Sequence, residues 1–139
     1  MQTFLPYSDF LSSAKCLDNK RLGKQRVECL QILNTLLTEG SGWSNHPAVK
    51  MWKFHEACLA DYGFHICNEW IGRGFRDTVA EKLGDLLTLC RDDSILVPYW
   101  MGDPNFHRSH QSNLVRKLPD HYRKFFPDVP DDLPYVWPV

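Results

Sequence analysis

The chain has 139 residues, of which 43% are apolar and 24% are charged, a composition typical of globular proteins. Sixteen Lys and Arg residues against seventeen Asp and Glu residues give a formal net charge of -1, which excludes a uniformly basic coat but not a local basic patch. The longest apolar run, Ile95–Met101, is too short to cross a membrane, and the first residues lack a signal-peptide pattern. We therefore expect one domain over residues 1–139, located in the cytoplasm.

The first predicted helices follow from N-cap residues and the spacing of apolar side chains. Ser8 is a candidate N-cap for a short helix that ends near Leu17, and Asp18 is a candidate N-cap for a long helix over residues 20–38. The apolar side chains of the long helix recur every three to five residues, which predicts a buried stripe. The stripe would consist of Leu22, Val27, Leu30, Leu33 and Leu37.

Glycine and proline mark the limits of the next predicted helices. Gly40 and Gly42 would end the long helix. Pro47 suits the first turn of another helix, which Asn45 or His46 would cap and Gly63 would end.

The second half of the chain predicts three more helices and a long tail. Residues 64–71 would form a helix closed by Gly72 and Gly74, and residues 78–81 have the spacing of a capping box that opens a helix through Leu89. Residues 94–105 would be irregular, and residues 109–117 would form the last helix. The proline-rich residues after Pro119 would lie extended on the body. The expected fold class is therefore all-α, with an extended C-terminal arm.

The cysteines and histidines lack the spacing of a metal site. Five cysteines include no CxxC pair, and most lie among apolar residues, which favours buried, reduced thiols. His107 and His110 could share one helical face, but no HExxH motif and no third ligand accompany them. We expect no bound metal. Trp43, Trp52, Trp70 and Trp100 are expected in the core.

Positive charge is concentrated in two segments. Residues 15–26 contain five basic side chains and one acidic side chain, and residues 106–124 contain the same numbers. Such segments either contact a phosphate backbone or simply solvate a helix face. On the first segment, one helical face carries Arg21, Lys24, Gln25 and Glu28. These residues form either surface ion pairs or a phosphate-binding cleft that contains a carboxylate for acid catalysis or electrostatic stabilisation.

Residues 17–28 (LDNKRLGKQRVE), after the start MQTFLP, resemble the pyrimidine dimer DNA glycosylase family in its bacterial and viral branch. Further resemblance lies in Asn45-His46-Pro47, Met51-Trp52, Glu69-Trp70, Arg73-Gly74 and residues 130–138. The chain is more distantly similar to the phage endonuclease V glycosylases, which are all-α and also cleave abasic sites. The resemblance implies an all-α fold and a DNA substrate.

The resemblance also implies a mechanism. An N-terminal amine attacks the sugar C1′ of a flipped nucleotide and forms an imine, with help from a glutamate. An α-amine has a pKa of about 7.7–8.0 against about 10.4 for lysine, so much more of it is neutral near pH 7. The nucleophile here would be the Met1 amine, or that of Gln2 if Met1 is removed. Gly23 stands where the glutamate is expected, and Glu28 is the nearest carboxylate on the polar face.

The predicted partner is duplex DNA with a damaged or modified pyrimidine, and the imine chemistry needs no cofactor. The residues expected to bind DNA or phosphate are Arg21, Lys24, Gln25, Arg26, His46, His110, Arg116 and Lys117. For His46 the simpler interpretation is a helix cap before Pro47, and a role in the site is the alternative. The alternatives are a non-catalytic binder of nucleic acid or of a nucleotide-like molecule on the same scaffold, and a helical protein-interaction module.

Overall fold

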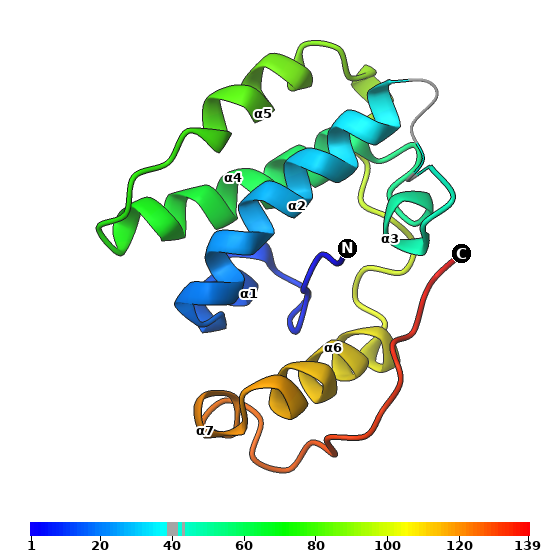
Figure 1. The fold of residues 1–139 in the computed structure, drawn as a ribbon. Coiled ribbons are helices and arrows are strands. Elements are labelled where there is room, and N and C mark those ends of the chain that lie inside the picture. Colours follow the sequence, from blue (N-terminus) through cyan, green and yellow to red (C-terminus); the bar gives the residue numbers. More distant parts are fainter. Residues whose placement is uncertain (39–41, 43) are drawn as a thin grey trace.

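The computed structural model describes residues 1–38, 42 and 44–139, and throughout these ranges it contains helices and no strand. The expected all-α fold is confirmed (Figure 1). The helices are α1 (Phe10–Cys16), α2 (Asn19–Leu37), α3 (Pro47–Lys50), α4 (Glu56–Gly72), α5 (Val79–Leu87), the 3-10 helix η1 (Asp92–Ile95), α6 (Pro104–Lys117) and α7 (Pro119–Tyr122).

Helices α2 and α4 lie side by side, and α5 packs against both of them. The apolar core between them includes Leu22, Leu33, Leu59 and Leu83. Val27, expected in the buried stripe of α2, is instead 54% exposed. Val27 follows Leu22 by five residues. Because an α-helix has 3.6 residues per turn, a step of five residues turns the side chain away from the buried stripe.

The long helix α4 replaces the two helices predicted on either side of Gly63. This glycine does not end a helix, and a Cβ atom there would lie 2.7 Å from both Cys29 Sγ and Leu83 Cδ1. Gly63 therefore allows α2 and α5 to approach α4 closely. Helix α4 ends at Gly72, as predicted, and Gly74 follows with a φ of +94°.

Two helix starts differ in detail from the predictions. Asp9, not Ser8, caps α1 by accepting a hydrogen bond from the Ser12 amide at 2.8 Å. Thr78 is the N-cap residue of α5, as predicted, but the Asp77 side chain and not that of Thr78 accepts from the Ala80 amide, at 2.9 Å. Asp18 does precede α2, but its carboxylate accepts hydrogen bonds from Tyr122 and Arg21 and not from the helix backbone. Gly40 and Trp43 lie outside the described residues.

Helix α6 begins at Pro104, earlier than predicted, because Asp103 caps it through the Asn105 amide at 3.0 Å. The tail was predicted to be extended from Pro119, but Pro119–Tyr122 form the short helix α7, and the part without helix covers residues 123–139. The tail runs along α6, where Ser112 Oγ accepts from the Leu133 amide at 3.0 Å and Ser109 Oγ accepts from the Val136 amide at 3.1 Å. These bonds fix the last residues of the chain on the body.

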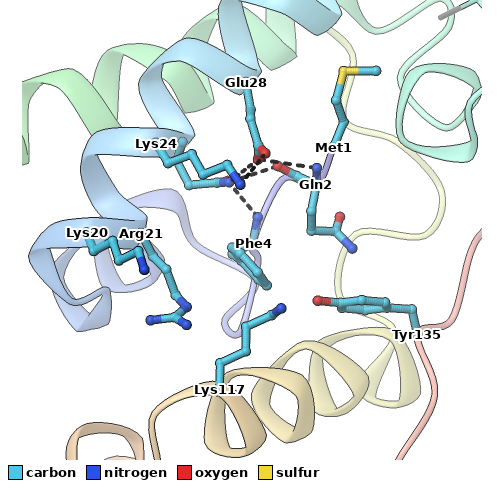
Figure 2. Close-up of a pocket in the computed structure, with 10 residues that line it drawn as sticks. Met1, Gln2, Phe4, Lys20, Arg21, Lys24, Glu28, Lys117 and Tyr135 are labelled. Atoms are coloured by element: carbon cyan, nitrogen blue, oxygen red, sulfur yellow. Dashed lines mark hydrogen bonds and ion pairs between the residues drawn. The ribbon is translucent and has the colours of Figure 1, made fainter.

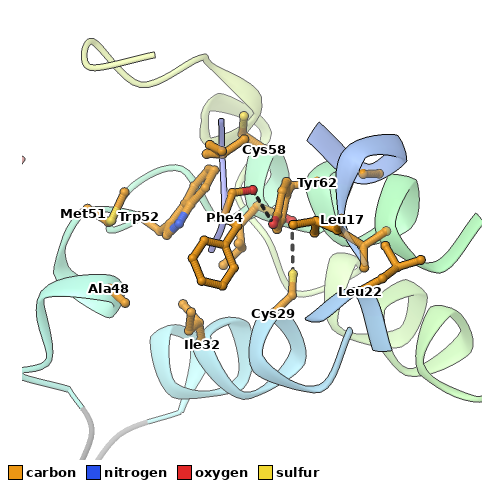
Figure 3. Packing of buried hydrophobic residues seen from close by; sticks show 14 of the residues in the cluster. Phe4, Leu17, Leu22, Cys29, Ile32, Ala48, Met51, Trp52, Cys58 and Tyr62 are labelled. Carbon is orange, nitrogen blue, oxygen red and sulfur yellow. Dashed lines mark hydrogen bonds between the residues drawn. The ribbon is translucent and has the colours of Figure 1, made fainter. Parts of the chain in front are cut away.

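The N-terminal segment, residues 1–7, runs between α2 and α6 (Figure 1). Leu5 is fully buried, and its amide donates to His110 Nδ1 at 2.9 Å while its carbonyl accepts from His107 Nδ1 at 2.7 Å. Trp52 Nε1 donates to Thr3 Oγ1 at 3.0 Å. The segment is thus part of the interior packing of the molecule, and Figure 3 shows Phe4 within the apolar cluster beside Trp52.

All five cysteines are free, and burial raises their thiol pKa values, to about 11 for Cys58 and about 12 for Cys67. Among the described residues, no three His, Cys, Asp or Glu side chains are grouped as metal ligands would be. None of the described helices combines the length and the apolar character that crossing a bilayer demands.

Candidate active site

A cavity of about 380 Å³ opens where the first residues of the chain meet one face of α2 (Figure 2). Lys117 at the end of α6 and Tyr135 of the tail complete its wall. The lining residues are Met1, Gln2, Phe4, Lys20, Arg21, Lys24, Gln25, Glu28, Lys117 and Tyr135. The face of α2 that the sequence predicted therefore lies next to the start of the chain.

The Glu28 carboxylate lies beside the N-terminal backbone. Its Oε2 atom accepts from the Gln2 amide at 3.3 Å and from Gln25 Nε2 at 2.9 Å. Its Oε1 atom lies 3.7 Å from Lys24 Nζ. With one face bound to protein donors and a side chain that is 13% exposed, this carboxylate is held in one orientation.

Four basic side chains, from Lys20, Arg21, Lys24 and Lys117, line the same cavity around this single carboxylate. Lys24 is largely exposed, so its ammonium group can turn toward a ligand. Arg21 forms an ion pair with Asp18 at 3.2 Å, and this contact restricts its guanidinium beside the cavity. An excess of positive charge over a small cavity favours an anionic ligand such as a phosphate group.

His46 lies at the same end of the molecule as the chain start. Its Nδ1 atom accepts from the Ala48 amide at 3.0 Å, which confirms the predicted cap of α3. Burial, followed by the positive charge of the Met1 α-amine, holds the pKa of His46 below its usual value, although Glu28 acts in the opposite direction. The imidazole is therefore a neutral neighbour of the amine at pH 7.

Arg26, expected to bind phosphate, faces a different part of the fold. Its guanidinium forms a 2.6 Å ion pair with Asp77 and lies 4.4 Å from the centre of the Trp70 ring. Arg26 does not line the cavity. The contacts join α2 to the segment that precedes α5, so they serve the packing of the helices.

Two further residues expected to bind phosphate are also occupied elsewhere. His110 is fully buried, and burial together with His107 lowers its pKa to about 3, so it is neutral and out of reach of a ligand. Arg116 donates to the Asp131 carbonyl at 2.6 Å and to the side chain of Asn113. From the second basic segment, only Lys117 lines the cavity.

Gly23 has a packing role. A Cβ atom at this position would lie 2.8 Å from the ring of Trp70. A glutamate cannot be accommodated here unless Trp70 moves, and this side of α2 does not line the cavity. Glu28 is the only carboxylate among the residues that line it.

Three lining residues were not predicted from the sequence, namely Phe4, Lys20 and Tyr135. Lys20 lies one helical turn before Lys24, so its position on the basic face could have been found from the helical period. Phe4 and Tyr135 are brought to the cavity only by the path of the N-terminal segment and the tail. They supply aromatic surface close to the charged groups (Figure 2).

Residues 1–82 match the family model described as pyrimidine dimer DNA glycosylase. The match includes every residue that lines the cavity except Lys117 and Tyr135. Comparisons with curated proteins and with solved structures give no significant match.

Proposed function

The chain belongs to the pyrimidine dimer DNA glycosylase family, and from this premise we propose that the cavity beside its N-terminus is the active site of a glycosylase that also cleaves abasic sites. The observation that supports the proposal is that three features lie together at this cavity. They are the start of the chain, a fixed carboxylate and a group of cations.

The proposed nucleophile is the α-amine of Met1, which is half-buried in the cavity wall. The lone pair of the amine forms a bond to C1′ while the glycosidic bond breaks. The electron pair of the broken bond stays with the base, which takes up a proton. Loss of the amine proton and opening of the sugar ring then give an imine. The imine draws electrons from C2′, so a C2′ proton is lost and the 3′ phosphate departs.

Glu28 supports this sequence as the ionised partner of the reacting groups. Positive charge develops on C1′ and then on the imine nitrogen, and a nearby carboxylate stabilises both. The same carboxylate can move a proton between the amine and the sugar ring oxygen. Its hydrogen bond from the Gln2 amide supports this role, because it places Glu28 one residue from the proposed nucleophile.

The four cations would hold the phosphates on either side of a nucleotide that has left the duplex stack. A flipped nucleotide is needed because a base inside the helix shields C1′ from the protein. Phe4 and Tyr135 offer aromatic surfaces against which an unstacked pyrimidine can pack. In this scheme Arg26, His110 and Arg116 support the scaffold, and His46 stays beside the amine as a neutral group.

Processing of the chain decides which amine reacts. The bulk of Gln2 favours retention of Met1. If Met1 were removed, the Gln2 nitrogen would become the free amine, and this atom lies 3.3 Å from Glu28 Oε2. In the processed form the free amine would thus lie beside this carboxylate, and the mass of the intact protein distinguishes the two forms.

Borohydride trapping tests the proposal. We expect incubation with duplex DNA that carries an abasic site, in the presence of borohydride, to give a covalent adduct. Peptide mapping should place the link on residue 1 or residue 2. Nα-acetylation should abolish the adduct, because an amide nitrogen has no available lone pair. An adduct that survives acetylation would assign the nucleophile to another residue.

A second candidate function is DNA binding without catalysis. It is favoured by the packing of Gly23 against Trp70, which leaves no room for the glutamate that the phage enzymes carry there. Under this alternative the cations would bind DNA in a salt-dependent way, and no base release or strand scission would occur at any pH.

A further inference from the structure

We propose that Gln25 is a positioning residue, which holds the start of the chain and the Glu28 carboxylate in their relative places and does not itself bind phosphate. The inference rests on the proposed function. It replaces the expected role of Gln25 as a phosphate ligand.

The Gln25 carboxamide makes four contacts, and all four are internal. Its Nε2 atom donates to the Gln2 carbonyl at 2.8 Å and to Glu28 Oε2 at 2.9 Å. Its Oε1 atom accepts from the Phe4 amide at 2.8 Å and lies 2.7 Å from the Tyr62 hydroxyl. An amide side chain has two N–H donors and two acceptor lone pairs, so Gln25 has no capacity left for a ligand.

These contacts also determine which way the amide points. The Phe4 nitrogen can only donate, so the group facing it must be the Gln25 oxygen. The Gln2 carbonyl and the Glu28 carboxylate can only accept, so the group facing them must be the nitrogen. A reversed amide would break the bonds to the Phe4 amide, the Gln2 carbonyl and the Glu28 carboxylate.

Burial makes the arrangement rigid. Gln25 is 1% exposed, and the Tyr62 side chain behind it is fully buried, with its hydroxyl 2.8 Å from the Phe4 carbonyl oxygen. Gln25 therefore connects α2, α4 and the N-terminal segment at one point. A buried, fully bonded group of this kind specifies one geometry, because each lost bond leaves a polar atom without a partner.

The Gln25 bridge affects catalysis because it fixes the distance between the proposed amine and the Glu28 carboxylate. The proposed amine and carboxylate belong to separate parts of the chain, and Gln25 bonds to both the Gln2 carbonyl and the carboxylate itself. Loss of the bridge would let the chain start and Glu28 move independently. A misplacement of about 1 Å in reacting groups can cost a factor of about 100 in rate.

Two substitutions test this role. Gln25→Met keeps the approximate size of the side chain and removes all four hydrogen bonds. Gln25→Glu keeps the shape, but the ionised side chain cannot donate and repels Glu28. When protonated, it regains one donor and so imitates part of the amide.

The matched control is Gln111→Glu. Gln111 on α6 also holds the N-terminal segment, since its Nε2 atom donates to the Pro6 carbonyl at 2.8 Å, but Gln111 does not line the cavity. The same substitution there loosens the segment without disturbing Glu28. If the Gln25 substitutions act only by loosening the N-terminal segment, Gln111→Glu should have the same effect.

The measurements are the single-turnover rate of glycosidic-bond cleavage in a duplex with one thymine dimer, and the Kd for the same duplex. We expect Gln25→Met to lower the rate constant about 100-fold while the Kd changes by less than about threefold, because a buried side chain does not touch DNA. Far-UV circular dichroism and urea unfolding show whether each variant is folded at the assay temperature.

The pH dependence separates positioning from general loosening. The rate of Gln25→Glu relative to the wild type should rise as the pH falls, since protonation of the new carboxyl restores a donor and removes the repulsion. The relative rate of Gln25→Met should not depend on pH. The titratable groups that interact with Glu28 remain in all variants, and they are Lys24, His46, Tyr62 and Tyr135.

The possible results are distinct. A Kd that rises as much as the rate falls would overturn the inference, because Gln25 would then act in DNA binding. Equal effects of Gln25→Glu and Gln111→Glu at every pH would also overturn it. Absence of base release by the wild-type protein would reject the proposed function and not the bridging geometry, which a crystal structure of Gln25→Met would still test.

Discussion

Two charged clusters that include side chains of α2 have different surroundings. The cavity cluster consists of Arg21, Lys24 and Glu28, and the packing cluster consists of Arg26, Asp77 and Trp70. The Glu28 side chain is 13% exposed and that of Arg26 is 15% exposed, so burial alone does not separate them. The difference is that the packing cluster is closed by its own partners, whereas the cavity cluster has more cations than its one carboxylate can satisfy.

This difference shows how function can be assigned to a basic helix. Arg26 is paired with a carboxylate that is itself almost fully buried, and the ring of Trp70 covers the guanidinium. Breaking that pair for a phosphate would leave Asp77 buried and unpaired, which is costly. Lys24 bears no such cost, since its contact with Glu28 is long and the side chain is exposed.

The largest expected effect comes from Glu28→Gln. The new side chain has the same shape and keeps an oxygen that can accept from the Gln2 amide, but it has no charge. We expect single-turnover base release to fall by about 100-fold or more, because the developing positive charge loses its partner. The control is Glu69→Gln, which removes a carboxylate that is bound to Arg73 at 2.9 Å and does not line the cavity. Equal losses in the two variants would contradict the assignment.

Arg26→Ala should affect stability and not chemistry. Removal of the guanidinium leaves the Asp77 carboxylate buried without its ion-pair partner, so the free energy of unfolding should fall by about 3 kcal/mol, measured by urea unfolding. Arg91→Ala is the control, since its ion pair with Asp93 is exposed and should be worth less than about 1 kcal/mol. A stable Arg26→Ala protein with impaired DNA binding would place Arg26 among the phosphate ligands after all.

Lys24→Ala and Lys117→Ala should weaken DNA binding moderately. If each ammonium contacts one phosphate, the slope of log K against log salt concentration should decrease by about 0.9 per substitution. Fluorescence anisotropy titrations at several salt concentrations measure this slope. Lys82→Ala, on α5 and outside the cavity, should leave the slope unchanged. An unchanged slope in all three variants would show that the cavity does not hold the DNA backbone.

The smallest expected effect is the pH dependence of stability at Asp77. Burial alone would raise the pKa of Asp77, but hydrogen bonds from the Ala80 amide and from Arg26 outweigh it and hold the pKa below its usual value. Its contribution to stability is therefore complete above about pH 4 and is lost as the pH falls through the folded-state pKa. Urea unfolding between about pH 3 and pH 6 should show a shallower decline for Asp77→Asn than for the wild type. Parallel curves would contradict this account.

Much of the helical pattern was readable in the sequence, since apolar period and caps are local properties. The limits of α2, the end of α4 and most of the extended tail followed from such signals. Gly63 was wrongly predicted to end a helix, because a glycine inside a helix and a glycine that ends one look alike in sequence. Only the proximity of Cys29 and Leu83 explains why a side chain is absent there.

The sequence by itself determined the all-α class, the basic face of α2 and the family of the chain, because each depends on residues that are close together or on a recognisable motif. Only the tertiary structure decided which of these residues share a cavity. In the folded protein, Arg26 is paired with Asp77, and His110 is buried in the interior. Phe4, Lys117 and Tyr135 come from distant parts of the chain to line the same cavity as Glu28. Which residues contact one another depends on their distances in the folded protein, and these distances cannot be read from the order of the residues.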